Sequence, residues 1–286
     1  MQCAVQPEPD QISVVETQIP QPTLSIQNWP NDGGASVARI HMVVIPPNYP
    51  VEVVVDDGLK TVEEFAADTN ALAVMNGGFF DPNNAQTTSF ITIDRFLVAD
   101  PRNNRRLVDN PALTIYMDQI LNRSEFRRYD CGEDIRYDIT FHNEAIPSGC
   151  MLHSALGAGP QLLPDDTSQI EGFTDYANDV LIRDAIGSKQ RNARSAIGIK
   201  QDGGLVWLMV AQVDSSGGMT LPELSAFMAN LGIQKALNLD GGSSSSLYTA
   251  FSDAVHSTQS KVYYGKLNQS AQVLQRPIKS VLLLSK

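Results

Sequence analysis

The chain has 286 residues, of which 42% are hydrophobic and 19% charged, so it carries enough apolar material for a packed core. Its formal net charge of −11 argues against nucleic acid and anionic membrane surfaces as main partners, because both require a basic face. An anionic substrate would have to be attracted by a local group of cations. The longest apolar run, 205–213, is too short to cross a bilayer.

The N-terminal region differs in composition from the rest. Residues 1–34 are predicted to form a tether, because prolines occur there among Gln, Glu, Thr and Asn with little apolar periodicity. Residues 35–286 are predicted to form the folded domain. Cys3, at the start of the tether, is either a lipid-anchored cysteine of an exported protein or an incidental residue. Pairing of cysteines cannot be read from sequence, so Cys131 and Cys150 are either separate thiols or a disulfide. A disulfide between them would stabilise the fold by roughly 3 kcal/mol.

The first half of the domain shows mostly strand patterns. Alternating or β-branched residues predict strands at 37–44, 51–55 and 71–75, the second of them ended by Asp56-Asp57-Gly58. Thr61 and Glu64 form a capping-box pattern before a short helix. Further strands are predicted at 90–98, 113–117 and 135–141, whereas the charged segments 100–110 and 123–134 are interpreted as loops or solvated faces.

The last third is the most regular. Strands are predicted at 195–200 and 205–213 around a glycine-containing turn, and at 236–239 and 277–284. Thr220 and Glu223 form a second capping-box pattern, which begins a helix that Gly232 would end. Many strands and few helices, without regular alternation, predict an α+β fold with a mixed, mainly antiparallel sheet and a few packed helices.

Two segments share one design, in which a short apolar strand ends in an Asn or Asp followed by two glycines. These are Asn76-Gly77-Gly78 and Asp240-Gly241-Gly242, and a run of four serines follows the second. Glycines at a strand end allow backbone N–H groups to turn toward a bound oxyanion. The alternative is two tight turns, since Asn-Gly and Asp-Gly are ordinary turn sequences.

Other candidates are more isolated. Arg194 precedes a predicted strand and would hold a phosphate through two N–H groups, or is a surface arginine. Gly159, followed by a proline, suits a close backbone approach or a simple turn. The four histidines show no metal-ligand spacing, so no dedicated zinc site is predicted.

Taken together, five motifs of this chain occur in the order typical of one family. The chain resembles the phosphodiester glycosidases, whose bacterial members are exopolysaccharide-related, over roughly residues 37–286. Ser195 stands where the family commonly has Thr, and Ser243 where a third Gly is common. The motifs are Asn76-Gly77-Gly78-Phe79-Phe80, Gly159-Pro160-x-Leu162, Arg194-Ser195-Ala196-Ile197-Gly198, Gly218-Met219-Thr220-Leu221-x-Glu223-Leu224 and Asn238-Leu239-Asp240-Gly241-Gly242-Ser243-Ser244.

The resemblance implies hydrolysis of the bond between a sugar's anomeric carbon and a phosphate. On this interpretation Asp240 is the catalytic carboxylate, as nucleophile, general base or stabiliser of the cationic sugar, and Arg194 holds the phosphate. Asn76 would orient a sugar hydroxyl or the phosphate. The other expected substrate-binding residues are Gly77, Gly78, Asp81, Gly159, Gly241, Gly242, Ser243 and Ser244.

Two alternatives use the same residues. The chain is also compatible with a non-catalytic envelope module that binds phosphate-containing glycans. A third interpretation is a hydrolase that cuts the P–O bond with Mg²⁺ or Ca²⁺ held by Asp81, Asp214 and Asp240. No other cofactor is predicted. Family habit, the tether and Cys3 predict export to the periplasm, the cell envelope or the medium.

Overall fold

The structure is a computed structural model that describes residues 20–30, 34–251 and 260–285. Its strands form three large sheets and two small hairpins, and all strand pairs in these ranges are antiparallel. Four α-helices and three short 3₁₀ helices accompany them in the same ranges. The predicted α+β class with a mainly antiparallel sheet is therefore confirmed.

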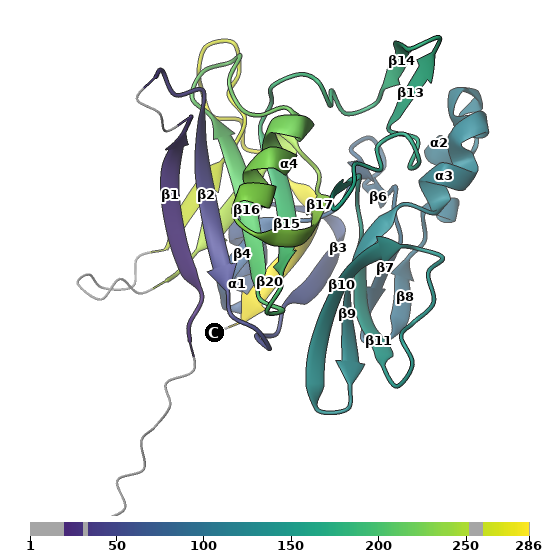
Figure 1. The fold of residues 1–286 in the computed structure, drawn as a ribbon, viewed down its shortest axis with the longest axis vertical. Coiled ribbons are helices and arrows are strands. Elements are labelled where there is room, and N and C mark those ends of the chain that lie inside the picture. Colours follow the sequence, from purple (N-terminus) through teal and green to yellow (C-terminus); the bar gives the residue numbers. More distant parts are fainter. Residues whose placement is uncertain (1–19, 31–33, 252–259, 286) are drawn as a thin grey trace, which may run out of the picture.

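The three sheets divide the chain without following its order (Figure 1). The first sheet has the order Thr23–Trp29 (β1), Ala38–Ile45 (β2), Leu205–Gln212 (β16), Arg194–Lys200 (β15), Ile233–Asn238 (β17) and Gln161–Leu163 (β12). The second sheet has the order Lys261–Tyr264 (β19), Ser246–Thr249 (β18), Ala71–Asn76 (β4), Ile278–Ser285 (β20) and Glu52–Lys60 (β3). The third sheet has the order Asp134–Phe141 (β10), Ser124–Cys131 (β9), Met151–Gly157 (β11), Ile91–Ile93 (β7) and Phe96–Ala99 (β8).

The hairpins and helices are short. The hairpins pair Phe80–Asp81 (β5) with Gln86–Thr87 (β6), and Thr174–Ala177 (β13) with Val180–Asp184 (β14). The α-helices are Val62–Thr69 (α1), Arg105–Val108 (α2), Met117–Leu121 (α3) and Leu221–Asn230 (α4). The 3₁₀ helices are Pro101–Asn103 (η1), Pro111–Tyr116 (η2) and Gly242–Ser244 (η3). None of the helices in the described ranges is long and apolar enough to cross a membrane.

Both predicted capping boxes are present. The Thr61 side chain accepts the backbone N–H of Glu64 at the start of α1, and the Glu64 side chain accepts the Thr61 N–H in return. Thr220 and Glu223 make the same reciprocal pair at the start of α4. These local bonds satisfy N–H groups that have no partner inside the helix, so each helix begins where the sequence predicts.

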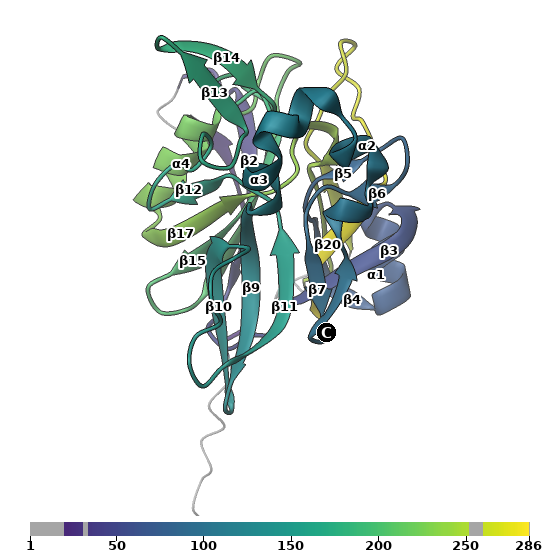
Figure 2. The same cartoon turned by 90° about the vertical axis from the view of Figure 1, so that its right-hand side faces the viewer.

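One hydrophobic core joins the three sheets. Trp207 from the first, Met75 from the second and Phe126 from the third are almost fully buried in one cluster. Helix α4 packs on the outer face of the first sheet and α1 on the outer face of the second, and each forms a further buried cluster (Figures 1 and 2). Burial on both faces fixes the strands of the two sheets, which then position the loops at their ends.

The structure corrects several sequence predictions. Residues 23–29 of the predicted tether form an edge strand, β1, which pairs with β2 and keeps mostly exposed side chains. The segment 113–117 lies in η2 and α3 instead of a strand, and 90–98 contains a turn between β7 and β8. Strand β3 continues through Asp56-Asp57-Gly58 to Lys60, and β20 pairs with it at 52–55 and again at Lys60, with an irregularity between the two paired parts.

The charged segment 123–134 is the largest correction. It contains β9, a buried strand of the third sheet and not a loop. Glu125 and Arg127 are 2% and 3% exposed, and the Arg127 Nε donates to Glu125 Oε2 over 2.8 Å. Because these charges pair with each other inside the fold, they do not mark a solvated face.

The structure decides between the two alternatives for Cys131 and Cys150. Cys131 at the end of β9 and Cys150 just before β11 form a disulfide. Cys3 and its expected lipid anchor lie outside the described residues.

Candidate active site

The two glycine-flanked strand ends meet in space. Asn76 ends β4 and is fully buried, and its Nδ2 donates to the Asp240 carbonyl oxygen over 2.7 Å. The Asp240 amide donates to the Gly77 carbonyl oxygen over 3.1 Å. Segments 164 residues apart in sequence are thus bonded to each other, and this pair of contacts holds the backbone of Asp240 in place.

The Asn76 side chain connects three segments of the chain by hydrogen bonds. Its Oδ1 accepts the Ser195 hydroxyl over 2.6 Å and the Ser246 amide over 3.1 Å. These partners come from β15 and β18, so one buried side chain connects the first and second sheets beside Asp240. With both ends of its amide occupied, Asn76 positions the neighbouring loop and has no free group for a sugar hydroxyl.

The first pair of glycines allows close packing. The Gly77 amide donates to the Ser280 carbonyl oxygen over 2.8 Å, and an added Cβ at Gly77 would lie 2.6 Å from Ser280 Oγ. An added Cβ at Gly78 would overlap the Gly157 carbonyl oxygen. Any larger residue would therefore push β4 away from β20 and β11, and the amide of Gly77 is not available to an anion.

The second pair of glycines forms the loop that carries Asp240. The Gly242 amide donates to the Ala193 carbonyl oxygen over 2.8 Å, and Gly242 has a φ of +61°, which favours glycine. Gly241 lies against the same carbonyl, 3.1 Å from where its Cβ would stand. The loop is therefore drawn onto the start of β15.

The Asp240 carboxyl has an unusual environment. Its side chain is only partly exposed, and burial raises its pKa from 3.8 to about 6. The Ser244 hydroxyl, the Arg276 charge and the Gly241 amide favour the ionised form and oppose this rise in pKa. A carboxyl with a raised pKa in a partly exposed loop is a typical acid–base group of an active site.

Arg276 is the cation beside this carboxyl, and it is not among the residues predicted from the sequence. Its Nη1 donates to Ser243 Oγ over 2.8 Å, and its guanidinium lies 5.3 Å from the Phe80 ring centroid. It is partly exposed, and it has no salt bridge to any described residue. It precedes the closing strand β20 as Arg194 precedes the strand predicted at 195–200, and this was the available signal.

Arg194 is placed differently from our expectation. It is 2% exposed, and burial lowers its pKa to about 10. Its Nε donates to the Met219 carbonyl, and its two terminal nitrogens donate to carbonyls of the 186–190 loop over 2.6 to 3.1 Å. Four of the five N–H groups of this guanidinium are thus used inside the protein. In this structure Arg194 binds loop backbone instead of facing a substrate.

A second cation, Lys266, lies near the Asp240 loop through Asn192. Lys266 Nζ donates to Asn192 Oδ1 over 2.7 Å, and burial lowers the pKa of Lys266. The Asn192 Nδ2 stands 3.5 Å from the place of a Cβ on Gly242. Arg276 and Lys266 therefore both lie near the 240–244 loop, and they supply positive charge there in a chain whose net charge is negative.

Unpaired buried polar atoms gather around the same loop. Asn238 Oδ1 and Ser245 Oγ are buried and have no hydrogen-bond partner among the described residues. Such atoms are few in native proteins, and these two lie within seven residues of each other, before and after Asp240 in sequence. The loop around Asp240 is accordingly the best candidate for the active site.

Comparison with known proteins identifies the family. A model of the phosphodiester glycosidase family matches residues 69–285. The chain belongs to this family. A sequence search of curated proteins finds no match.

Solved structures of similar fold are distant in sequence. The catalytic domain of zebrafish N-acetylglucosamine-1-phosphodiester alpha-N-acetylglucosaminidase, auto-inhibited by its pro-peptide, has a TM-score of 0.63 at 19% identity, covering 94% of this chain and 85% of that one. A hypothetical protein from Synechocystis has a TM-score of 0.55 at 16% identity, with coverages of 92% and 62%. A Burkholderia pseudomallei protein named as exported has a TM-score of 0.58 at 15% identity, with coverages of 87% and 74%.

Two expected site residues of this phosphodiester glycosidase family member have structural partners instead. Asp81 Oδ2 pairs with Arg106 Nε over 2.7 Å, and its other oxygen accepts the Asn83 amide in a turn. Asp214 likewise accepts the amide and the hydroxyl of Ser216. Within the described ranges no three His, Cys, Asp or Glu side chains gather as metal ligands, so Asp81, Asp214 and Asp240 are not brought together.

Gly159 supports the strand that leads to Asp240. Its amide donates to the Asn238 carbonyl over 3.0 Å, and Asn238 Nδ2 donates to the Gly159 carbonyl over 2.9 Å. An added Cβ at Gly159 would overlap the carboxylate of Glu171, which is 1% exposed and accepts from Ser124 and Gln161. Burial raises the pKa of Glu171, another structural group that the sequence did not reveal.

Proposed function

We propose that this chain hydrolyses a sugar-1-phosphodiester at the bond between the anomeric carbon and the phosphate oxygen, releasing the free sugar and a phosphate ester. Family membership supports the reaction class. The substrate contained in the name of the zebrafish enzyme supports the substrate class. The observation that carries the assignment of the site is the Asp240 carboxyl, which has a pKa of about 6 at the junction of two strand ends and lies next to Arg276.

The chemistry of the leaving group suits a site with one carboxyl. A phosphate monoester has a second pKa of about 6, so it leaves with much less protonation than a sugar alkoxide needs. As the C–O bond breaks, its electron pair goes to the phosphate oxygen. A water molecule forms the new bond to the anomeric carbon and gives its proton to Asp240, whose pKa of about 6 suits a general base near neutral pH.

The phosphate in this proposal is held by Arg276, with Ser243 as its neighbour. Their hydrogen bond fixes the guanidinium against the Asp240 loop, and the charge of Arg276 already acts on the carboxyl. Lys266, bonded to Asn192, adds positive charge near the same loop. Preorganised donors directed at developing negative charge are commonly the largest contribution to catalysis. Arg194, occupied by carbonyls, takes the role of a positioning residue.

Turnover and binding separate an enzyme from a binding module. We expect the purified protein to release free sugar from a UDP-linked or p-nitrophenyl-phosphate-linked sugar, and Asp240→Asn to lower the rate by about 10²-fold or more. The exposed Asp165 has no hydrogen bond among the described residues and provides a control, Asp165→Asn, which should keep full activity. Binding without turnover would favour the non-catalytic module, and full turnover by folded Asp240→Asn would remove Asp240 from the mechanism.

We also propose that the protein is exported. The Cys131–Cys150 disulfide is typical of oxidising compartments, and one structural neighbour is named as an exported protein. Free-thiol titration of protein taken directly from the cell envelope or the medium tests this proposal, with the expectation that these two thiols are oxidised there.

A further inference from the structure

A cavity lies between two sheets, away from Asp240. It has a volume of about 550 Å³ and is lined by β3 of the second sheet and by β9, β11 and the β7–β8 turn of the third. We call it the inter-sheet cavity and define it by Glu52–Val55, Ile93, Asp94, Arg128 and Ser154. Its volume is within the range of about 300–1,000 Å³ that small-molecule sites occupy.

Two residues that line this cavity each carry a buried polar atom without a hydrogen-bond partner in the described ranges. The Ser154 hydroxyl belongs to a side chain that is 3% exposed, and neither it nor the Arg128 Nε has a hydrogen-bond partner among the described residues. The nearest carboxylate to Arg128, that of Asp130, is 3.9 Å from Nη2 and so too far for a hydrogen bond. A buried donor without a partner costs about 1–3 kcal/mol. A ligand or ordered water in the cavity is the partner that would remove this cost.

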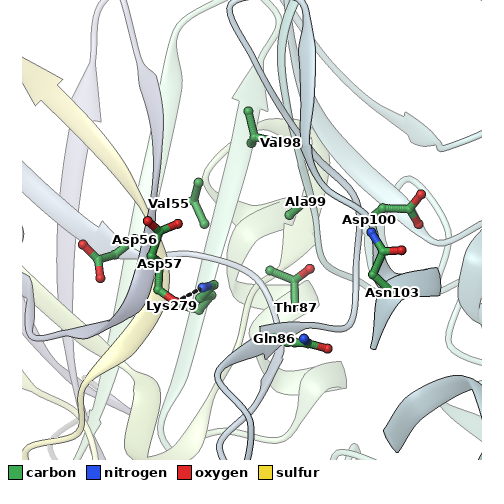
Figure 3. Close-up of a pocket in the computed structure, with 10 residues that line it drawn as sticks. All are labelled: Val55, Asp56, Asp57, Gln86, Thr87, Val98, Ala99, Asp100, Asn103 and Lys279. Atoms are coloured by element: carbon green, nitrogen blue, oxygen red, sulfur yellow. Dashed lines mark hydrogen bonds between the residues drawn. The ribbon is translucent and has the colours of Figure 1, made fainter. Parts of the chain in front are cut away.

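A smaller cavity of about 190 Å³ provides the contrast (Figure 3). Its main charged side chains have partners within the protein. Lys279 Nζ donates to the Asp57 carbonyl over 2.8 Å, and Asp100 pairs with Arg102 over 2.6 Å. None of the residues that line that cavity has a buried side-chain polar atom without a hydrogen-bond partner in the part of the chain that the structure describes, whereas two residues that line the inter-sheet cavity do.

The charges of the inter-sheet cavity favour a neutral ligand. Arg128 contributes a positive charge, while Glu52 and Asp94 place carboxylates at the exposed rim. His153 lies between Asp130, 3.1 Å away, and Asp94, 3.5 Å away. An anion would meet the two rim carboxylates and a cation would meet Arg128, so neither is matched by the site as a whole.

The remaining walls add a second requirement. Val53, Val55 and Ile93 give the cavity an apolar side opposite its donors and acceptors. We infer that the inter-sheet cavity binds a neutral sugar residue, because a sugar offers hydroxyls that both donate and accept together with an apolar C–H face. Ser154 and Arg128 donate to its hydroxyls, and Glu52 and Asp94 accept from them.

This site is distinct from the candidate active site. Gly157, at the far end of β11, packs against Gly78 beside the Asp240 loop, and Ser154 lies three residues earlier on the same strand. At about 3.3 Å per residue the two places are about 10 Å apart along the strand. The inference goes beyond the proposed reaction and does not depend on it.

The test is a titration of the isotope-labelled full chain by NMR. The probes are glucose, galactose, mannose, N-acetylglucosamine and their disaccharides, with inorganic phosphate and acetate as anionic controls. We expect at least one neutral sugar to shift the signals of residues 52–55, 93–94, 128 and 153–154. Ser154→Ala and Arg128→Lys, which each remove one unpaired donor, should weaken this binding about 2- to 12-fold.

The controls separate binding from folding and from catalysis. Ser89 has another buried, unpartnered hydroxyl but does not line the cavity, so Ser89→Ala should leave sugar binding unchanged. Ser154→Ala should melt no lower than the wild type, because it loses no hydrogen bond. Asp240→Asn should bind the sugar as the wild type does, so failure of the proposed reaction would leave this result intact. The inference is overturned if no sugar in the panel shifts these signals, if only the anions do, or if both cavity variants bind as the wild type does.

Discussion

Replacing Asp240 should make the protein more stable as it makes it less active. In the unfolded chain this carboxyl ionises near 3.8, whereas in the folded protein its pKa is about 6. Between these values the folded state binds more protons, so wild-type stability falls as pH rises from about 4 to about 6. The difference in pKa corresponds to about 3 kcal/mol at about 1.4 kcal/mol per pKa unit. Solvent at the partly exposed carboxyl reduces this figure, so about 3 kcal/mol is an upper value.

Asp240→Asn removes the ionisation and with it the cost. We expect its free energy of unfolding to exceed that of the wild type by up to about 3 kcal/mol at pH 7.5, and the gain to vanish near pH 4. Urea denaturation at pH 4, 5, 6 and 7.5, followed by circular dichroism, measures the difference. The surface substitution Asp165→Asn, measured in parallel, corrects for a general effect of losing one negative charge.

The outcome has a clear contrary result. The quantity to compare is the gain in unfolding free energy of Asp240→Asn over the wild type. If this gain is no larger at pH 7.5 than at pH 4, burial does not raise the pKa of Asp240. The argument that this carboxyl is a base adjusted to neutral pH would then fail.

Three further predictions concern neighbouring groups. Arg276→Gln should lower kcat/KM by about 10²-fold and move its acid limb to higher pH, since the positive charge that lowers the pKa of Asp240 is lost; an unmoved limb would contradict this. Asn76→Ala should lower the free energy of unfolding, measured in urea, by about 2–6 kcal/mol, because it leaves the Ser246 amide and the Asp240 carbonyl unpaired. A loss below about 1 kcal/mol would contradict the role of Asn76 in connecting these segments. Replacing Cys131 and Cys150 by serine should cost about 3 kcal/mol for a 19-residue separation, with little change in kcat, and an unchanged melting temperature would oppose it.

The features that were predicted best from sequence are helix starts and strand ends, which depend on residues close together in the chain. The capping boxes at Thr61 and Thr220 involve residues three apart. Strand β4 ends at Asn76 and β17 ends at Asn238, shortly before Asp240, because in each case an apolar run stops at a glycine-containing loop. The family motifs then brought these two ends into one hypothesis, and the Asn76–Asp240 bond confirms that they meet.

The sequence predictions were wrong where the environment of a residue depends on partners that are distant in sequence. The charges of Glu125 and Arg127 look solvated in sequence, but in the fold they pair with each other and with the 141–144 turn. Arg194 looks like a free guanidinium until the carbonyls of the 186–190 loop surround it. Arg276 is separated from Ser243 by 33 residues, and only the return of the chain through β20 brings them together.

The position of the broken bond tests the central claim most directly. The wild-type protein is incubated with a sugar-1-phosphodiester in ¹⁸O-labelled water, and the phosphate ester that is released is analysed by mass spectrometry. If Asp240 directs water to the anomeric carbon, the phosphate ester contains no ¹⁸O. An ¹⁸O atom in the phosphate ester would show attack at phosphorus and would contradict the account.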